Sequence, residues 1–381
     1  MRLPTAGSCL GTIGRKRVLE TLAAVDKLLL RVVTESSAWV ALPLFFVAGG
    51  AVGVPLAAWI DALVHSGPGD APFFACRVCG QKIGWLHRVP LVGPLLSGGR
   101  CPGCGTLRRQ SELLVQWGTG LLFAALAAAL LDQHCQAIPE QGNPAAIHWR
   151  LLFQLVLVSL LIVAAGVDLK CYLIPDAITL PGLAVGLTAA TLHGNLQLLP
   201  LWVDWNGPMV ELYGQYIPDW IKLHSHWHGL AWSLAGAAAG AAITWGVRVL
   251  GGWLLGVEAL GFGDVTLMAM IGSFVGWQPI VFIFPLAAVG SLCAGLLLKI
   301  ARARSAMPYG PALSAATLAV LMSWRWLWTP LRTLFGHWPT LLLLGAVFAS
   351  SLVALLGLLR IYRRIPVERR IQNPVDETPP P

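Results

Sequence analysis

Three aspartates stand at the ends of long apolar runs, where charged groups are costly. Asp168 ends one such run, within the stretch "GVDLKCYLIPDAITLPG" at 166–182, and Asp176 opens the next run. Asp264 closes the motif "GFGD" at 261–264. A charged side chain at the middle of a bilayer costs about 2.5–3.5 kcal/mol on insertion scales, so an acidic group retained beside hydrocarbon is a candidate for function.

Asp176 and Asp168 differ in their local sequence. Pro175 breaks the helix because proline lacks an N–H and disfavours helical backbone in the preceding residue. Asp176 therefore opens the next helix, where a carboxylate caps free N–H groups and opposes the helix dipole. We predict a structural role for Asp176. Asp168 has no such local structural role, and we predict that it is catalytic together with a partner residue.

Asp264 is the predicted partner, because the order of helices places it at the same face of the membrane as Asp168. Two neighbouring carboxyls cannot both ionise readily, so one keeps a proton while the other activates water as a base. Gly261 and Gly263 are predicted to bind substrate, because glycine permits the close approach of an extended backbone. The pattern favours an aspartic protease. A proton or ion relay is the alternative, because transporters also place carboxylates in membranes.

Four of the eight cysteines form two CxxC pairs, "CRVC" at 76–79 and "CPGC" at 101–104. Two such pairs can supply four thiolates to one tetrahedral zinc ion, and four protein ligands leave no open position for a catalytic water. Gly80 and Gly105 follow the pairs, where a tight turn requires a positive φ. We predict a structural zinc site in a reducing compartment, with four free thiols as the alternative. The predicted zinc ligands are Cys76, Cys79, Cys101 and Cys104.

The composition is that of a polytopic membrane protein. Of the 381 residues, 56% are hydrophobic and 12% are charged, and the mean hydropathy is +0.69. This is too apolar for an ordinary soluble domain. The net charge of +8 fits basic cytoplasmic loops that contact anionic membrane lipid. Because the basic stretches lack interleaved aromatic residues, no nucleic-acid partner is expected.

Apolar windows mark the helices that must position these residues, since roughly 17–25 residues span a bilayer. The windows cover 38–60, 113–131, 151–167, 173–192, 229–256, 265–278, 279–299, 310–328 and 340–359. The sixth window is short, and it is either tilted or half of a re-entrant pair with the seventh. We therefore predict an all-α transmembrane bundle of eight or nine helices. The basic 65–110 loop is assigned to the cytoplasm, although the basic N-terminus conflicts with the resulting alternation.

Five regions follow from this pattern, and one of them contains a predicted helix contact. The small residues of "GAAAG" at 236–240 predict close packing between two helices. The regions are a basic, amphipathic N-terminal segment (1–37), a first transmembrane helix (38–64), a cytoplasmic four-cysteine zinc loop (65–112), a transmembrane aspartic peptidase core (113–360) and a cytoplasmic tail (361–381).

Four pieces of the sequence, in this order, resemble the type IV prepilin peptidases, a family of membrane aspartic proteases. They are the two CxxC pairs with "VPLVGPLLSGGRC" between them, "DLKCYLIPD", "GFGDVTLMAMIGSFVGW" and "PYGPAL", within residues 40–325. The resemblance implies that Asp168 and Asp264 are catalytic. It also implies that the substrates are prepilins, or pseudopilins of type II secretion, whose short basic leaders are cut at the cytoplasmic face of the bacterial inner membrane. Many members then methylate the new N-terminus with S-adenosylmethionine.

Two positions qualify the resemblance. Glu112 matches a glutamate that follows the cysteine loop in the family, and its role is either helix-start electrostatics or methyl transfer. The family usually has a lysine two residues after the GxGD aspartate, where this chain has Thr266, which affects the expected pH optimum. We predict a prepilin leader peptidase that also acts as an N-methyltransferase. The alternatives are a proton- or ion-coupled transporter with a structural zinc loop and a catalytically silent scaffold of a secretion machine.

Overall fold

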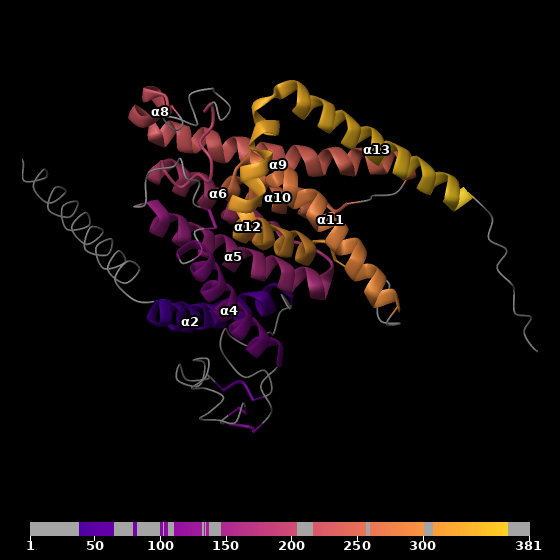
Figure 1. Cartoon of the computed structure of the whole chain (residues 1–381). Helices are drawn as coiled ribbons and strands as arrows, with labels where there is room; N and C mark the ends of the chain where they lie inside the picture. Colours follow the sequence, from indigo (N-terminus) through magenta and orange to yellow (C-terminus); the bar gives the residue numbers. More distant parts are fainter. Residues whose placement is uncertain are drawn as a thin grey trace, which may run out of the picture.

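The computed structural model describes residues 38–64, 79–81, 100–101, 103–105, 110–131, 133, 135–136, 146–203, 216–256, 260–300 and 308–364. The predicted N-terminal segment, most of the cysteine loop and most of the C-terminal tail lie outside these residues. The elements of the described part are α-helices (Figure 1). The predicted all-α fold is therefore confirmed.

The described helices match the predicted windows closely. Each of the nine windows corresponds to one helix, although the sixth, 265–278, extends from α10 into the first two residues of α11. Only α8, which has five residues, was not predicted among the described helices. The helices are α2 (Ala38–Val64), α4 (Gln110–Leu131), α5 (Ala146–Cys171), α6 (Asp176–His193), α8 (Asp219–Leu223), α9 (Ser225–Leu255), α10 (Phe262–Val275), α11 (Trp277–Ile300), α12 (Gly310–Gly336) and α13 (Trp338–Arg364).

The chain is a multi-pass membrane protein. Five described helices, α2, α4, α5, α9 and α11, are long and apolar enough to cross a membrane, and α12 with α13 forms a sixth segment that is bent by 106°. The predicted eight or nine helices are present, but they give only five or six candidate spans. One reason is that α10 has 14 residues, or about 21 Å of helix, which is less than the ~30 Å hydrocarbon core. Another is that α6 carries the polar residues Asp176 and His193 at its two ends.

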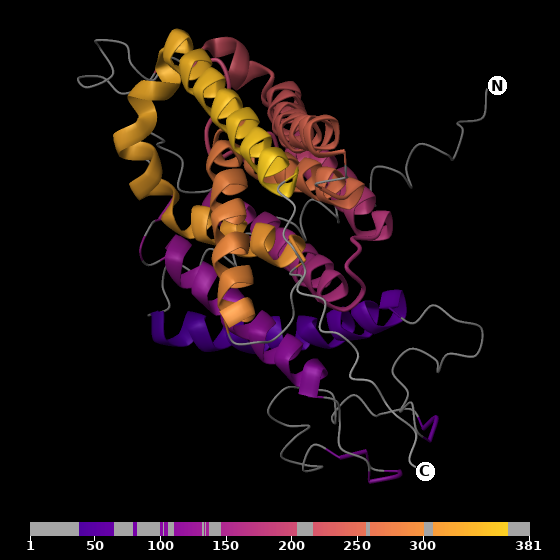
Figure 2. The same cartoon turned by 90° about the vertical axis from the view of Figure 1, so that its right-hand side faces the viewer.

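Helix α5 lies at the centre of the bundle. It contacts α2, α4, α6, α10 and α12, and its residues Leu157, Val158 and Val163 are fully buried. Helices α2 and α4 cross each other at one end of the bundle, whereas α13 lies at the other end (Figures 1 and 2). Because α5 ends at Cys171, its central position places the nearby Asp168 among the ends of several other helices.

Helices α9 and α10 approach each other through glycines. A Cβ atom added to Gly236 would meet the carbonyl oxygen of Gly272, and one added to Gly272 would meet the carbonyl oxygen of Gly236. A Cβ at Gly240 would likewise meet the carbonyl oxygen of Met268. The close contact predicted from "GAAAG" is therefore confirmed. It fixes the position of α10, whose first turn contains Asp264.

We expect Gly236→Ala to lower the free energy of unfolding by about 1–3 kcal/mol, because the new methyl group overlaps the Gly272 carbonyl and pushes α9 and α10 apart. Gly246→Ala on the same helix is the matched control. A Cβ at Gly246 meets no atom within 4 Å, so this change should be neutral or stabilising. Thermal unfolding of the detergent-solubilised variants, followed by circular dichroism, measures both effects. Equal unfolding temperatures for Gly236→Ala and the wild type would contradict the close α9–α10 contact.

Candidate active site

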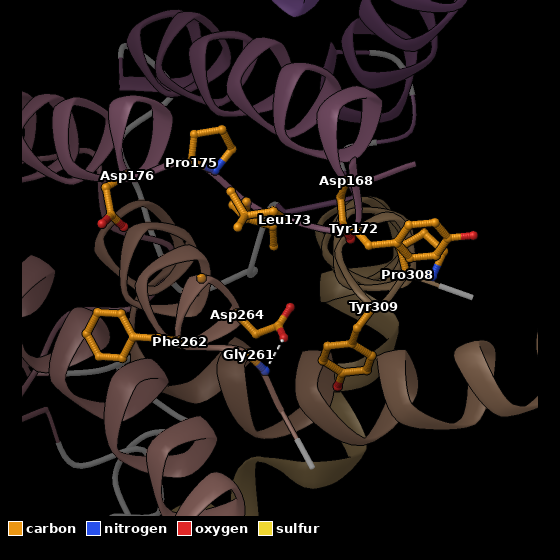
Figure 3. Close-up of a pocket in the computed structure, with 12 residues that line it drawn as sticks. Asp168, Tyr172, Leu173, Pro175, Asp176, Gly261, Phe262, Asp264, Pro308 and Tyr309 are labelled. Atoms are coloured by element: carbon orange, nitrogen blue, oxygen red, sulfur yellow. Dashed lines mark hydrogen bonds between the residues drawn. The ribbon is translucent and has the colours of Figure 1, made fainter. Parts of the chain in front are cut away.

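A pocket of about 420 Å³ opens where the end of α5 meets the first turns of α6, α10 and α12 (Figure 3). Its walls are Asp168, the α5–α6 connection at 172–176, the "GFGD" turn at 261–264 and residues 308–309. Segments that are far apart in the sequence thus converge on one concave site. Both Asp168 and Asp264 line it, as the pairing of the two aspartates in the sequence analysis requires.

Asp168 lies in the last turns of α5 and is only 5% exposed. Its Oδ2 atom accepts a hydrogen bond of 2.8 Å from the backbone N–H of Gly310, the first residue of α12. A Cβ atom at position 310 would lie 2.6 Å from this Oδ2, so the contact requires glycine. The N–H donor favours a charged carboxylate at Asp168. Sequence reasoning used "PYGPAL" only as part of a resemblance and missed the role of Gly310.

Asp264 lies in the first turn of α10, which is too short to cross the membrane. Its Oδ2 atom accepts a hydrogen bond of 3.1 Å from the backbone N–H of Gly261. The pKa of Asp264 is raised to about 6, with burial as the largest cause, and the Gly261 hydrogen bond opposes the rise. The negative charge of Asp168 contributes to the rise, and the positive charge of Arg248 opposes it. The two aspartates are therefore close enough to influence each other's ionisation.

The two glycines before Asp264 line the pocket for different reasons. A Cβ atom at Gly263 would lie 2.9 Å from the carbonyl oxygen of Ile174, so Gly263 allows the "GFGD" turn to pack against the α5–α6 connection. The nearest atom to a Cβ at Gly261 would be Oδ2 of the Asp264 carboxylate, at 3.3 Å. Gly263 thus has an intramolecular role that the sequence did not reveal. Substrate contact by Gly261 and Gly263 stays a prediction.

Two further residues support the site, and sequence reasoning assigned neither of them to it. Arg248 of α9 donates a hydrogen bond of 2.8 Å from Nη1 to the carbonyl oxygen of Leu260, directly before the "GFGD" turn. Tyr309 donates one of 3.3 Å from its hydroxyl to the carbonyl oxygen of Phe284. Burial, and then the charge of Asp264, raise the pKa of Tyr309. An arginine within the otherwise apolar run of α9 was the one sequence signal that could have pointed to Arg248.

Asp176 lies in the first turn of α6, but no side chain caps this helix, whose N-cap residue is Pro175. The position of Asp176 agrees with the predicted interaction with the helix dipole. The predicted capping hydrogen bond from its side chain is wrong. The Thr266 hydroxyl lies 3.5 Å from Oδ1 of Asp176 and donates to the carbonyl oxygen of Gly263 at 3.1 Å. The side chain at position 266, where the family usually has lysine, thus faces Asp176 at the edge of the pocket.

An ion pair ties α5 to the helix that precedes the cysteine loop. Nζ of Lys170 lies 2.9 Å from Oδ1 of Asp61, and Lys170 follows Asp168 by two positions. Asp61 belongs to the last turn of α2, after which the chain continues into the cysteine loop. The pair joins the last turn of α2 to the end of α5 that lines the pocket.

Three of the predicted metal ligands, Cys79, Cys101 and Cys104, lie together with their sulfurs within 4.8 Å of one another. Sγ of Cys79 is 3.8 Å from Sγ of Cys101, and two sulfurs on a tetrahedral zinc with Zn–S of about 2.3 Å are also about 3.8 Å apart. The cluster can therefore hold a metal ion. Gly80 and Gly105 have φ values of 71° and 68°, which confirms the predicted turns. Cys76 lies outside the described residues.

Two family models match the chain. The model of the type IV leader peptidase family matches residues 155–298, which include both aspartates. The model of the bacterial peptidase A24 N-terminal domain matches residues 52–130, which extend from α2 through the cysteine loop into α4. The two matched regions together contain every residue predicted for the catalytic and metal sites.

Curated relatives carry the name prepilin leader peptidase/N-methyltransferase. The relative from Klebsiella pneumoniae is 31% identical over 207 residues, which cover 54% of this chain and 70% of the relative. The relative from Aeromonas salmonicida is 27% identical over 254 residues, or 66% and 71% of the two chains. The relative from Myxococcus xanthus is 27% identical over 267 residues, or 69% and 66%.

No solved structure matches the chain. The transporter interpretation gains no support from any match, and the resemblance drawn from the sequence motifs is confirmed. Identity of 31% across 70% of a curated relative, together with the two family models, establishes that this chain belongs to the type IV leader peptidase family.

Proposed function

We propose that the protein cleaves the N-terminal leader of a prepilin or pseudopilin by aspartic protease chemistry in the pocket between α5, α10 and α12. The observation that carries this proposal is that Asp168 and Asp264 line one pocket and that the charge of Asp168 raises the pKa of Asp264. The names of the relatives support the substrate class. We place the reaction at the cytoplasmic face of the bacterial inner membrane.

The two carboxyls take complementary parts in the proposed reaction. Asp264 keeps the shared proton, which its raised pKa favours, and Asp168 is the base, which the Gly310 N–H favours. Water attacks the scissile carbonyl carbon and gives a proton to Asp168, while Asp264 protonates the carbonyl oxygen. When the C–N bond breaks, Asp168 returns its proton to the leaving nitrogen and Asp264 recovers its proton from the hydroxyl. The products are the leader carboxylic acid and a new N-terminus.

The cysteine cluster is proposed to hold a structural zinc ion through Cys79, Cys101 and Cys104, with Cys76 as the fourth ligand. The sulfur spacing supports zinc, because it matches that of two thiolates on one tetrahedral ion. Methylation of the new N-terminus with S-adenosylmethionine is proposed as a second activity, supported by the names of the relatives. Glu112 lies in the first turn of α4, beside the end of the cysteine loop, and is a candidate for either helix stabilisation or methyl transfer.

We expect Asp168→Asn and Asp264→Asn each to reduce leader cleavage by at least about 10²-fold, because each change removes a proton acceptor or donor from the pair. Asp219→Asn is the control, since Asp219 is an exposed carboxylate of α8 that pairs with Lys222. Mass spectrometry of a co-expressed prepilin measures cleavage and methylation of its N-terminus together. Cleavage at the wild-type rate by either active-site variant would refute the assigned pair.

We expect Gly310→Ala to reduce the rate of cleavage by about 10²-fold or more, because the added Cβ displaces the Asp168 carboxylate and removes a preorganised hydrogen bond. Gly295→Ala on α11 is the matched control, because a Cβ there meets no atom within 4 Å. Cleavage is measured on purified variants whose helical content is first verified by circular dichroism. A fully active Gly310→Ala variant would show that this contact does not position Asp168 for catalysis.

We expect about one zinc ion per chain in the purified protein and clearly less in Cys101→Ser, because that change removes one of the four thiolates. Cys293→Ser should keep its zinc, since Cys293 lies on α11 and outside the cysteine cluster. Metal content is measured by inductively coupled plasma mass spectrometry. A metal-free wild-type protein would count against the zinc site.

A further inference from the structure

Tyr172, in the wall of the pocket, has a backbone conformation that its side chain disfavours. Its φ is 54°, and Tyr172 and Trp202 are the two non-glycine residues with positive φ within the part of the chain that the structure describes. In this left-handed region a Cβ atom crowds the backbone, so glycine and asparagine are the usual occupants. Strained backbone of this kind concentrates at functional sites.

The fold requires the left-handed conformation at position 172 but does not require tyrosine. The Tyr172 N–H donates a hydrogen bond of 2.8 Å to the carbonyl oxygen of Asp168, which closes the end of α5. The chain then turns away and runs through the α5–α6 connection to Pro175, which has extended backbone angles. Glycine at this position would end the helix in the same way without strain. The local backbone therefore explains the left-handed turn, but it does not by itself select an aromatic residue for this position.

Tyr172 is one of several large, exposed side chains in the pocket wall. It lines the wall and is 49% exposed, and the neighbouring lining residues Leu173 and Phe262 are 63% and 57% exposed. Figure 3 shows the ring projecting from the same helix end that carries Asp168. Large, exposed apolar side chains thus share the pocket wall with the two carboxyls, where a bound peptide can contact them.

We infer that Tyr172 is a substrate-binding residue whose ring contacts an apolar side chain next to the scissile bond. This inference rests on the proposed peptidase function. Aromatic rings provide a large, rigid contact surface, and Tyr172 lies one helical turn from Asp168. A substrate side chain held by the ring is therefore positioned relative to the catalytic carboxylate. The competing explanation is that the ring anchors the protein among lipid head groups, where tyrosine is also enriched.

Tyr172→Gly and Tyr172→Phe distinguish these explanations. The probe is a synthetic peptide that spans the leader junction of a prepilin, cleaved by the full-length protein in detergent micelles. Tyr172→Gly should lower kcat/KM by about 10- to 100-fold, mainly through KM, because the apolar contact is lost. Tyr172→Phe should stay within about threefold of the wild type, since it keeps the ring. The unfolding temperature of Tyr172→Gly should be unchanged or higher, because glycine relieves the strain.

Trp202→Gly is the matched control for the backbone change. Trp202 has a φ of 57° and follows α6, whose 18 residues give about 27 Å of helix between it and the pocket. Its ring contacts Trp220 and His228, which lie outside the pocket wall. We expect its kcat/KM to equal that of the wild type. A loss in Trp202→Gly as large as that in Tyr172→Gly would assign both effects to the backbone and overturn the inference.

Changes in the substrate complete the test. Large apolar residues near the scissile bond of the peptide are replaced one at a time by alanine. At the contacted position, Tyr172→Gly should no longer reduce kcat/KM, because the partner of the ring is gone. A Tyr172→Gly variant with wild-type kcat/KM, or one whose activity and unfolding temperature fall together, would overturn the inference and leave the peptidase function intact. Failure of the wild-type protein to cleave the peptide would instead refute the peptidase function itself.

Discussion

One hydrogen bond, from the N–H of Gly310 to Oδ2 of Asp168, sets the geometry on which the rest of the site depends. It joins the end of the central helix α5 to the first residue of α12. Because the carboxylate is almost fully buried, it requires a donor, and a neutral backbone amide provides one without adding a competing positive charge. This N–H favours the charged form of Asp168, which lines the same pocket as Asp264.

The second half of the site depends on packing rather than on polar contacts. Backbone-to-backbone contact at Gly236 and Gly272 sets where α10 lies against α9, and Gly263 allows the first turn of α10 to touch the α5–α6 connection. Arg248 then holds the carbonyl of Leu260 just before that turn. Small residues therefore bring the helices close, and one cation holds the Leu260 carbonyl beside the "GFGD" turn. Rigid elements of this kind hold an active site more accurately than flexible loops do.

Local sequence was sufficient for features that depend on neighbouring residues. The apolar windows predicted the helices, the residues after each CxxC pair predicted the turns at Gly80 and Gly105, and "GAAAG" predicted a close helix contact. The motifs also paired Asp168 with Asp264, because membrane topology restricts each helix end to one of two faces. Features that arise from distant segments could not be predicted in this way. Gly310 matters only because α12 begins beside α5, and the number of membrane spans depends on the 106° bend between α12 and α13.

The ion pair between Asp61 and Lys170 has a consequence for how two reactions could follow one another. It holds the last turn of α2, from which the cysteine loop departs, against the stretch of α5 where peptide cleavage is proposed. A group bound near that loop would be tethered on the same side of the bilayer as the freshly released amine. If the proposed methyl transfer takes place beside this loop, the released amine reaches the methyl donor without crossing hydrocarbon.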